Sequence, residues 1–179
     1  PTTIMESVKR IKTSDELLDL VKSTDEDIKN TWISDFKNLQ LEISEIQYSI
    51  SKDDLIFNNK SKLISGSFDS VIKRMSESEY KQHITEADQK TISKTLTKLL
   101  AYMTPFDKVK DLKLFEFLLL TAAGIREPYS SDSVKVLREI IHKFSKNFKI
   151  DMDSKLESFL SKFLVIVALV FNQNDLIEG

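Results

Sequence analysis

Apolar side chains recur at steps of three and four residues between residues 28 and 50. The residues are Ile28, Trp32, Phe36, Leu39, Ile43, Ile46 and Ile50. An α-helix turns once every ~3.6 residues, so positions three and four apart share a face and can be buried together. The pattern therefore predicts a helix of about 26 residues, roughly 39 Å long. We expect it to pack against other helices.

Glycine and proline are scarce, with three of each in 179 residues. Average usage is about 7% for glycine and 5% for proline. Sheet folds need turn glycines, whereas long helices joined by polar loops do not. The sequence has no repeat with a period of about 30 to 50 residues, which argues against a solenoid. We predict an all-α fold: a single bundle of about six to eight helices, with a long N-terminal helix and a buried apolar C-terminal helix.

Short polar motifs predict where several helices begin. In a capping box, a hydroxyl or carboxylate side chain accepts from a free backbone amide at the start of a helix. Thr104 followed by Pro105 predicts the start of a central helix, and Gly124 is expected to end it in the left-handed conformation. Three pairs predict further helix starts: Thr13 with Glu16, Thr24 with Asp27, and Thr85 with Asp88.

Two more helices are predicted after the loop at residues 125–129. The first begins at Ser130 or Ser131, and the second at Asp151 or Asp153. The last helix contains nine consecutive apolar residues, 163–171. That run is too short to span a bilayer, which needs about 20, so we expect it to be buried. The preceding helix carries a second seam: Val134, Leu137, Ile141, Phe144 and Phe148.

We assign residues 13–175 to one domain, residues 1–12 to a flexible N-terminal segment and residues 176–179 to a C-terminal tail. Residues 51–70 allow two interpretations, a loop with a broken helical turn or a small hairpin across Asn58 and Asn59. One or two short helices are expected over residues 67–83. No apolar run of signal-peptide length occurs at the start, which favours a cytoplasmic protein.

Composition argues against several kinds of chemistry. Twenty-six basic and 28 acidic residues leave a net charge of −2 with both signs interspersed, which argues against nucleic-acid binding. There is no cysteine, and the two histidines, His83 and His142, lack a zinc-binding partner at helical spacing. Asp151 and Asp153 resemble the start of a calcium loop, but no glycine occupies its sixth position. We therefore predict no cofactor, no metal, no catalytic residue and no enzymatic activity.

Five residues are candidates for contact with a partner. Trp32 and Phe36 lie on the long seam, and tryptophan is common at the centres of protein interfaces. Arg126, Glu127 and Tyr129 lie in a loop between two helices, where binding residues are often found. Each also has a structural explanation, namely burial for the two aromatic residues and turn formation for the loop.

These observations favour a non-enzymatic interaction or adaptor domain that uses helical surfaces to bind a protein partner or a second copy of itself. The alternative is a membrane-active or membrane-regulating protein that stores two hydrophobic helices, residues 106–123 and 159–171, inside a bundle. A third hypothesis, an enzyme with a site in the bundle core, would need converging carboxylates or histidines that the sequence does not reveal.

Overall fold

The computed structural model describes residues 13–49, 73–103, 112–148 and 153–178. These ranges contain only helices and turns, which confirms the predicted all-α bundle. The hairpin considered near Asn58 and the helix start at Thr104 and Pro105 lie outside them. The elements are α2 (Asp15–Ser23), α3 (Glu26–Ser49), α6 (Glu77–Glu86), α7 (Gln89–Met103), α8 (Lys113–Ala123), α9 (Ser131–Asn147), α10 (Ser154–Val170) and the 3-10 helix η2 (Asn174–Leu176).

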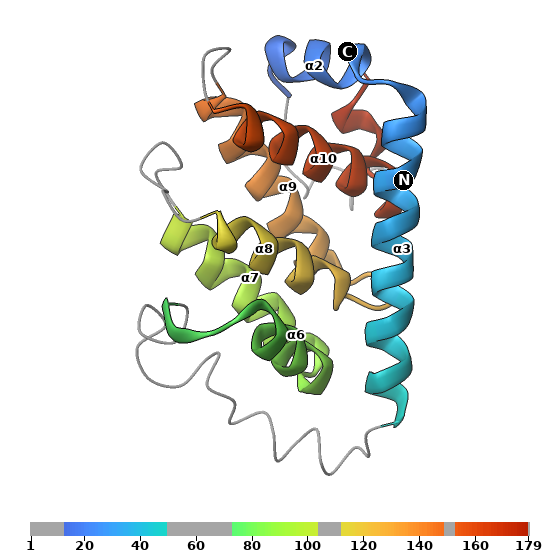
Figure 1. Cartoon of the computed structure of the whole chain (residues 1–179), viewed down its shortest axis with the longest axis vertical. Coiled ribbons are helices and arrows are strands. Elements are labelled where there is room, and N and C mark those ends of the chain that lie inside the picture. The colour runs from blue at the N-terminus through green and yellow to red at the C-terminus, as the bar shows by residue number, and fades with distance from the viewer. Residues whose placement is uncertain (1–12, 50–72, 104–111, 149–152, 179) are drawn as a thin grey trace.

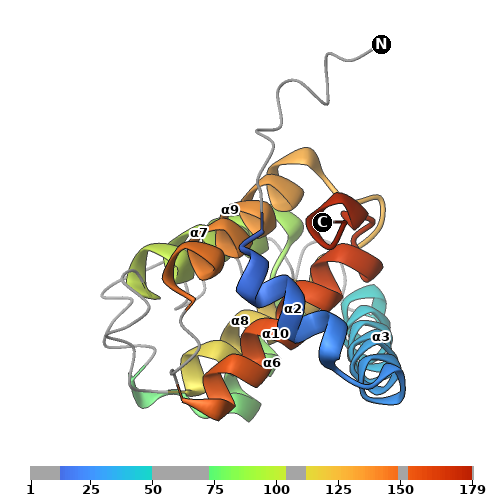
Figure 2. The same cartoon turned by 90° about the horizontal axis from the view of Figure 1, so that it is seen from above.

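The helices form two layers, and α3 runs across one side of them (Figure 1). α10, α8 and α6 lie one above another in the first layer, while α9 and α7 form the second (Figure 2). The long helix α3 runs crosswise to the first layer and contacts all three of its helices. α2 packs on α10 at one end of the bundle. Only one side of α3 therefore faces the bundle.

The most apolar helices, α8 and α10, form the centre of the core. All α8 residues from Phe117 to Ala123 are buried. In α10 the apolar run at residues 163–171 is buried except at Leu169, as predicted for the last helix. Phe115 of α8 packs on Phe159 of α10 with ring centroids 5.0 Å apart. Within the described ranges, no helix has both the length and the apolar character needed to cross a membrane.

The start of α2 differs from the prediction by one residue. The Ser14 hydroxyl, not that of Thr13, accepts a hydrogen bond from the Leu17 amide at 3.4 Å. The Thr13 hydroxyl instead donates to the Leu176 carbonyl oxygen at 2.6 Å, in a buried contact with the other end of the domain. The Thr13 hydroxyl is thus engaged by a residue 163 positions away in sequence, and the adjacent Ser14 hydroxyl caps the helix.

Aspartates replace threonines at two other predicted starts. The Asp25 carboxylate accepts from the Asp27 amide at 2.7 Å at the start of α3. The Asp88 carboxylate accepts from the Thr91 amide at 2.8 Å at the start of α7. Thr85 lies in the last turn of α6, where its hydroxyl donates to a carbonyl oxygen of the same helix. A charged oxygen is the stronger acceptor for a free amide, which favours these caps.

Gly124 ends α8 in the right-handed conformation, with φ −78° and ψ −9°, so the predicted left-handed cap is wrong. Lack of space explains the glycine instead. A Cβ atom there would lie 2.6 Å from Ile84 Cγ2 and 3.0 Å from Ile92 Cδ1. The starts predicted at Ser130 and Asp153 are confirmed, since both side chains cap their helices.

Candidate functional site

One stripe of α3 side chains faces the bundle, and it is only partly apolar. Its residues, at steps of three and four, are Ile33, Phe36, Gln40, Ile43 and Gln47. Phe36 is 2% exposed and Ile43 is fully buried. The buried Gln47 side chain donates through Nε2 to the Ile84 carbonyl oxygen at 3.3 Å. We call this set the core-facing stripe.

A second stripe lies beside it and combines apolar with acidic side chains. We call it the outer stripe; its residues are Ile28, Trp32, Asp35, Leu39, Glu42 and Ile46. Ile28 is 48% exposed and Ile46 is 42% exposed. Trp32 and Leu39 are half-buried and pack against the core. The apolar seam predicted over residues 28–50 therefore combined residues from both stripes.

The charge of α3 is strongly biased. The helix contains five carboxylates and two lysines, a net charge of −3. One lysine, Lys29, forms an ion pair with Glu26 at 2.7 Å and donates to the Val21 carbonyl oxygen at 3.2 Å. Asp35 and Glu42 of the outer stripe are exposed. The accessible side of α3 is thus both apolar and acidic.

Phe171 joins α3 to the loop between α8 and α9. Its ring centroid lies 5.9 Å from that of Phe36 and 4.7 Å from that of Tyr129. Burial raises the pKa of Tyr129, and a hydrogen bond with Gln40 opposes this while the charge of Glu127 adds to it. Two predicted partner-binding residues, Phe36 and Tyr129, therefore meet around the buried Phe171 ring, and a third, Glu127, interacts with Tyr129. Phe36 lies in the core and is not accessible to a partner.

Gln89 holds the start of the same loop against α7. Its Nε2 donates to the Gly124 carbonyl oxygen at 3.0 Å, and its Oε1 accepts from the Arg126 amide at 2.9 Å. Arg126 is half-buried and Glu127 is exposed. These contacts add to the structural role that the sequence predicts for the loop. The sequence did not reveal them, because Gln89 lies more than 30 positions earlier.

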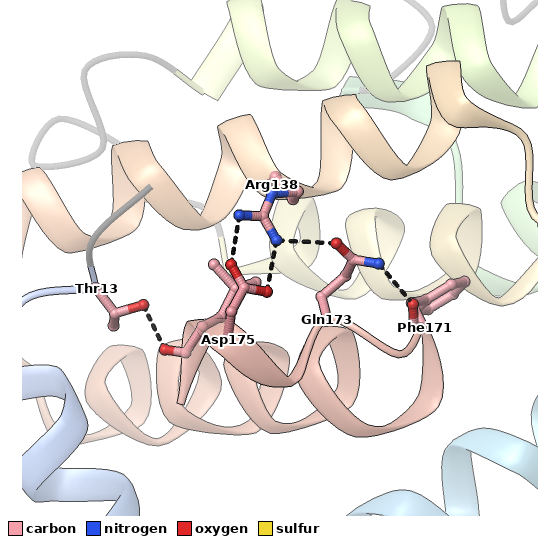
Figure 3. A network of polar contacts seen from close by, with 6 residues as sticks. Thr13, Arg138, Phe171, Gln173 and Asp175 are labelled. Atoms are coloured by element: carbon pink, nitrogen blue, oxygen red, sulfur yellow. Dashed lines mark hydrogen bonds and ion pairs between the residues drawn. The ribbon is translucent and has the colours of Figure 1, made fainter. Parts of the chain in front are cut away.

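A polar network fastens the C-terminal segment to α9 (Figure 3). Arg138 is only 4% exposed. Its two terminal nitrogens donate to the two Asp175 oxygens at 2.9 and 2.7 Å, and Nη1 also donates to Gln173 Oε1 at 2.9 Å. The sequence carries no local sign of this pair, because 37 positions separate its members. The arrangement explains how a buried guanidinium is tolerated.

The surface between α7 and α9 contains an open hollow of about 320 Å³. Its charged lining has two lysines, Lys94 and Lys135, and two carboxylates, Asp132 and Glu139. Such a balance favours neither an anionic nor a cationic ligand. Across the part of the chain that the structure describes, no three acidic or histidine side chains are grouped to hold a metal ion.

Comparison with known proteins finds no matching family model, no matching curated protein and no matching solved structure. The described residues form an all-α bundle in which one long helix, α3, presents an apolar and acidic side to the surroundings.

Proposed function

We propose that this protein is a non-enzymatic interaction domain that binds a protein partner through the outer stripe of α3. One observation carries the proposal: four large apolar side chains lie along one line of the helix and retain accessible surface. Ile28 and Ile46 are 18 positions apart, which corresponds to five turns of ~3.6 residues and about 27 Å. A partner helix of about 18 residues, at a rise of ~1.5 Å each, would cover the whole line.

The four apolar residues of the outer stripe differ from other exposed apolar residues because they lie in one line along the helix. Single exposed apolar side chains are common on protein surfaces and need no explanation. Leu41 is such a case, at 58% exposed. It follows Leu39 by two positions and points to roughly the opposite side of α3, because consecutive residues are ~100° apart. In the outer stripe, by contrast, four apolar side chains share one line, and one of them is Trp32, a residue type enriched among those that contribute most to binding.

The test compares two faces of the same helix. Ile28→Asp and Ile46→Asp, alone and together, should abolish capture of the partner from source-cell extract, because each replaces an apolar side chain with a carboxylate that would face apolar residues of the partner. Leu41→Asp is the matched control, with the same chemical change and similar exposure on the other side of α3. Circular dichroism and urea unfolding establish that all variants are folded. An equal loss of partner capture by the control and by the stripe variants would contradict the proposal.

The only tryptophan in the chain gives a second readout. Trp32 is half-buried, so a bound partner should remove more water from its indole ring and shift its fluorescence emission to shorter wavelength. The Leu41→Asp protein should show the same shift as the unmodified chain. An unchanged emission spectrum in a saturated complex would contradict binding at the outer stripe.

A homodimer through the same stripe is the other form of this proposal. It would bring together two helices that each have a net charge of −3, which disfavours it relative to a partner of opposite charge. Sedimentation at increasing protein concentration separates the two forms. We expect a constant sedimentation coefficient, and self-association that Ile28→Asp abolishes would favour the dimer instead.

A further inference from the structure

The charges on the outer stripe restrict the chemistry of what binds there. We infer that its partner is a basic amphipathic helix. The apolar side chains of that helix would cover the four apolar residues of the outer stripe, and its lysines or arginines would lie against Asp35 and Glu42. This inference rests on the proposed function, because it names the partner of the same surface.

The order of residues along the stripe is the first argument. Asp35 lies between Trp32 and Leu39, and Glu42 lies between Leu39 and Ile46. Any helix that covers the apolar residues must therefore also cover or border both carboxylates. An apolar side chain there would remove water from a carboxylate without replacing its hydrogen bonds, and an acidic one would be repelled. A basic side chain avoids both costs, since its aliphatic stem contacts apolar surface while its charged end reaches a carboxylate.

The structure already contains one contact of this kind. Lys81 belongs to a different helix, α6, and its Nζ lies 2.5 Å from Glu42 Oε1. The Glu42 side chain nevertheless remains 56% exposed. One carboxylate of the outer stripe thus pairs with a lysine presented by a neighbouring helix, and its side chain remains accessible. Asp35, nearer the middle, is exposed on the same line.

The rest of α3 has the same bias. Its five carboxylates outnumber its two lysines, and the ion pair between Lys29 and Glu26 leaves the net charge of −3 unchanged. The net negative charge of α3 attracts a basic helix that approaches this side, which speeds association and makes it sensitive to salt. A second copy of α3 or an acidic helix would be repelled by the same charges.

The experiment uses a phage-displayed library of amphipathic helices selected on the full chain. The apolar positions are fixed at steps of three and four, and the polar positions are randomised among Lys, Glu, Gln and Ser. We expect the recovered peptides to be enriched in lysine. Asp35→Lys should weaken their binding by about tenfold or more, because it reverses a charge inside the contact. Glu45→Lys changes the net charge of α3 equally but lies off the outer stripe, so we expect less than about a threefold effect.

The outcomes separate this inference from the proposed function. Lysine-rich peptides that lose binding with Asp35→Lys but not with Glu45→Lys support both. Peptides without lysine enrichment whose binding still depends on Ile28 and Ile46 would overturn the inference and leave the proposed function standing. If no recovered peptide depends on Ile28 and Ile46 for binding, both the inference and the proposed function are overturned. Self-association through the outer stripe in sedimentation would also contradict binding of a basic helix.

Discussion

Tyr80 places a titratable hydroxyl in the centre of the core. Its ring stacks on Phe117 with centroids 4.1 Å apart, and its hydroxyl lies 2.6 Å from that of Thr121. The Thr121 hydroxyl donates to the Phe117 carbonyl oxygen at 2.7 Å. Because that proton is already used, Tyr80 is the donor to Thr121. The core tolerates the Tyr80 hydroxyl because that hydroxyl has a defined hydrogen-bond partner.

Tyr80→Phe should cost about 1 kcal/mol of stability at neutral pH through loss of this hydrogen bond. It should also make the protein less sensitive to alkali. Burial raises the pKa of Tyr80 above its ordinary value of 10.0, so above that pH the unfolded chain releases a proton that the folded chain retains. The free energy of unfolding that this pKa difference contributes is fully present below pH 10.0 and is lost as the pH rises above that value.

Urea unfolding of both proteins between about pH 8 and pH 11 measures this difference. Above pH 10.0 the unmodified chain should lose stability faster than Tyr80→Phe, by up to about 1.4 kcal/mol per pH unit. Equal slopes for the two proteins would show that Tyr80 ionises as readily in the folded state as in the unfolded chain.

At the scale of elements, the end of α8 is set by how closely its neighbours approach. Gly124 follows α8, while Ile84 belongs to α6 and Ile92 to α7. The backbone at Gly124 is in the ordinary right-handed region, which alanine also adopts without strain. The need for glycine therefore comes from packing between helices and is unrelated to backbone conformation.

Gly124→Ala should destabilise the fold by about 1–3 kcal/mol, because its Cβ would overlap Ile84 and crowd Ile92. The same change should cost less in an Ile84→Ala background, where space has been made for the new methyl group. Chemical denaturation of the two single variants and the double variant gives this comparison as a double-mutant cycle. Strictly additive effects would contradict the packing explanation.

At the scale of the whole molecule, the two ends of the described domain are fastened to each other and to α9. Thr13 contacts Leu176, and Asp175 pairs with Arg138. Most residues of the core helices α8 and α10 are buried within the same bundle. Membrane activity, the alternative considered from sequence, would require these two helices to leave the centre of the fold.

Asp175→Ala should destabilise the whole domain by about 1–3 kcal/mol, because it leaves the buried Arg138 guanidinium without its carboxylate. Glu178→Ala is the matched control. It removes the same charge from the same segment, but Glu178 is exposed, so a change within about 0.5 kcal/mol is expected. Thermal unfolding of the three proteins measures both effects, and equal losses in the two variants would show that the ion pair adds no stability.

The sequence by itself determined that this chain is an all-α bundle, that it contains one long helix near its N-terminus, and that its last helix is buried. These properties depend on apolar spacing and on the scarcity of glycine, both of which act over one or two helical turns. The starts of helices were located to within a few residues for the same reason, as Ser130 and Asp153 illustrate.

Only the tertiary structure decided which side of α3 faces the core, because Gln40 and Gln47 occupy that side and find partners on distant elements. It also decided that Phe36 is buried while Ile28 remains accessible, and it revealed the partner of Arg138. The physical reason is common to all of these. Whether a polar group can be buried, or an apolar one left exposed, depends on neighbours contributed by remote parts of the chain, and local periodicity carries no information about them.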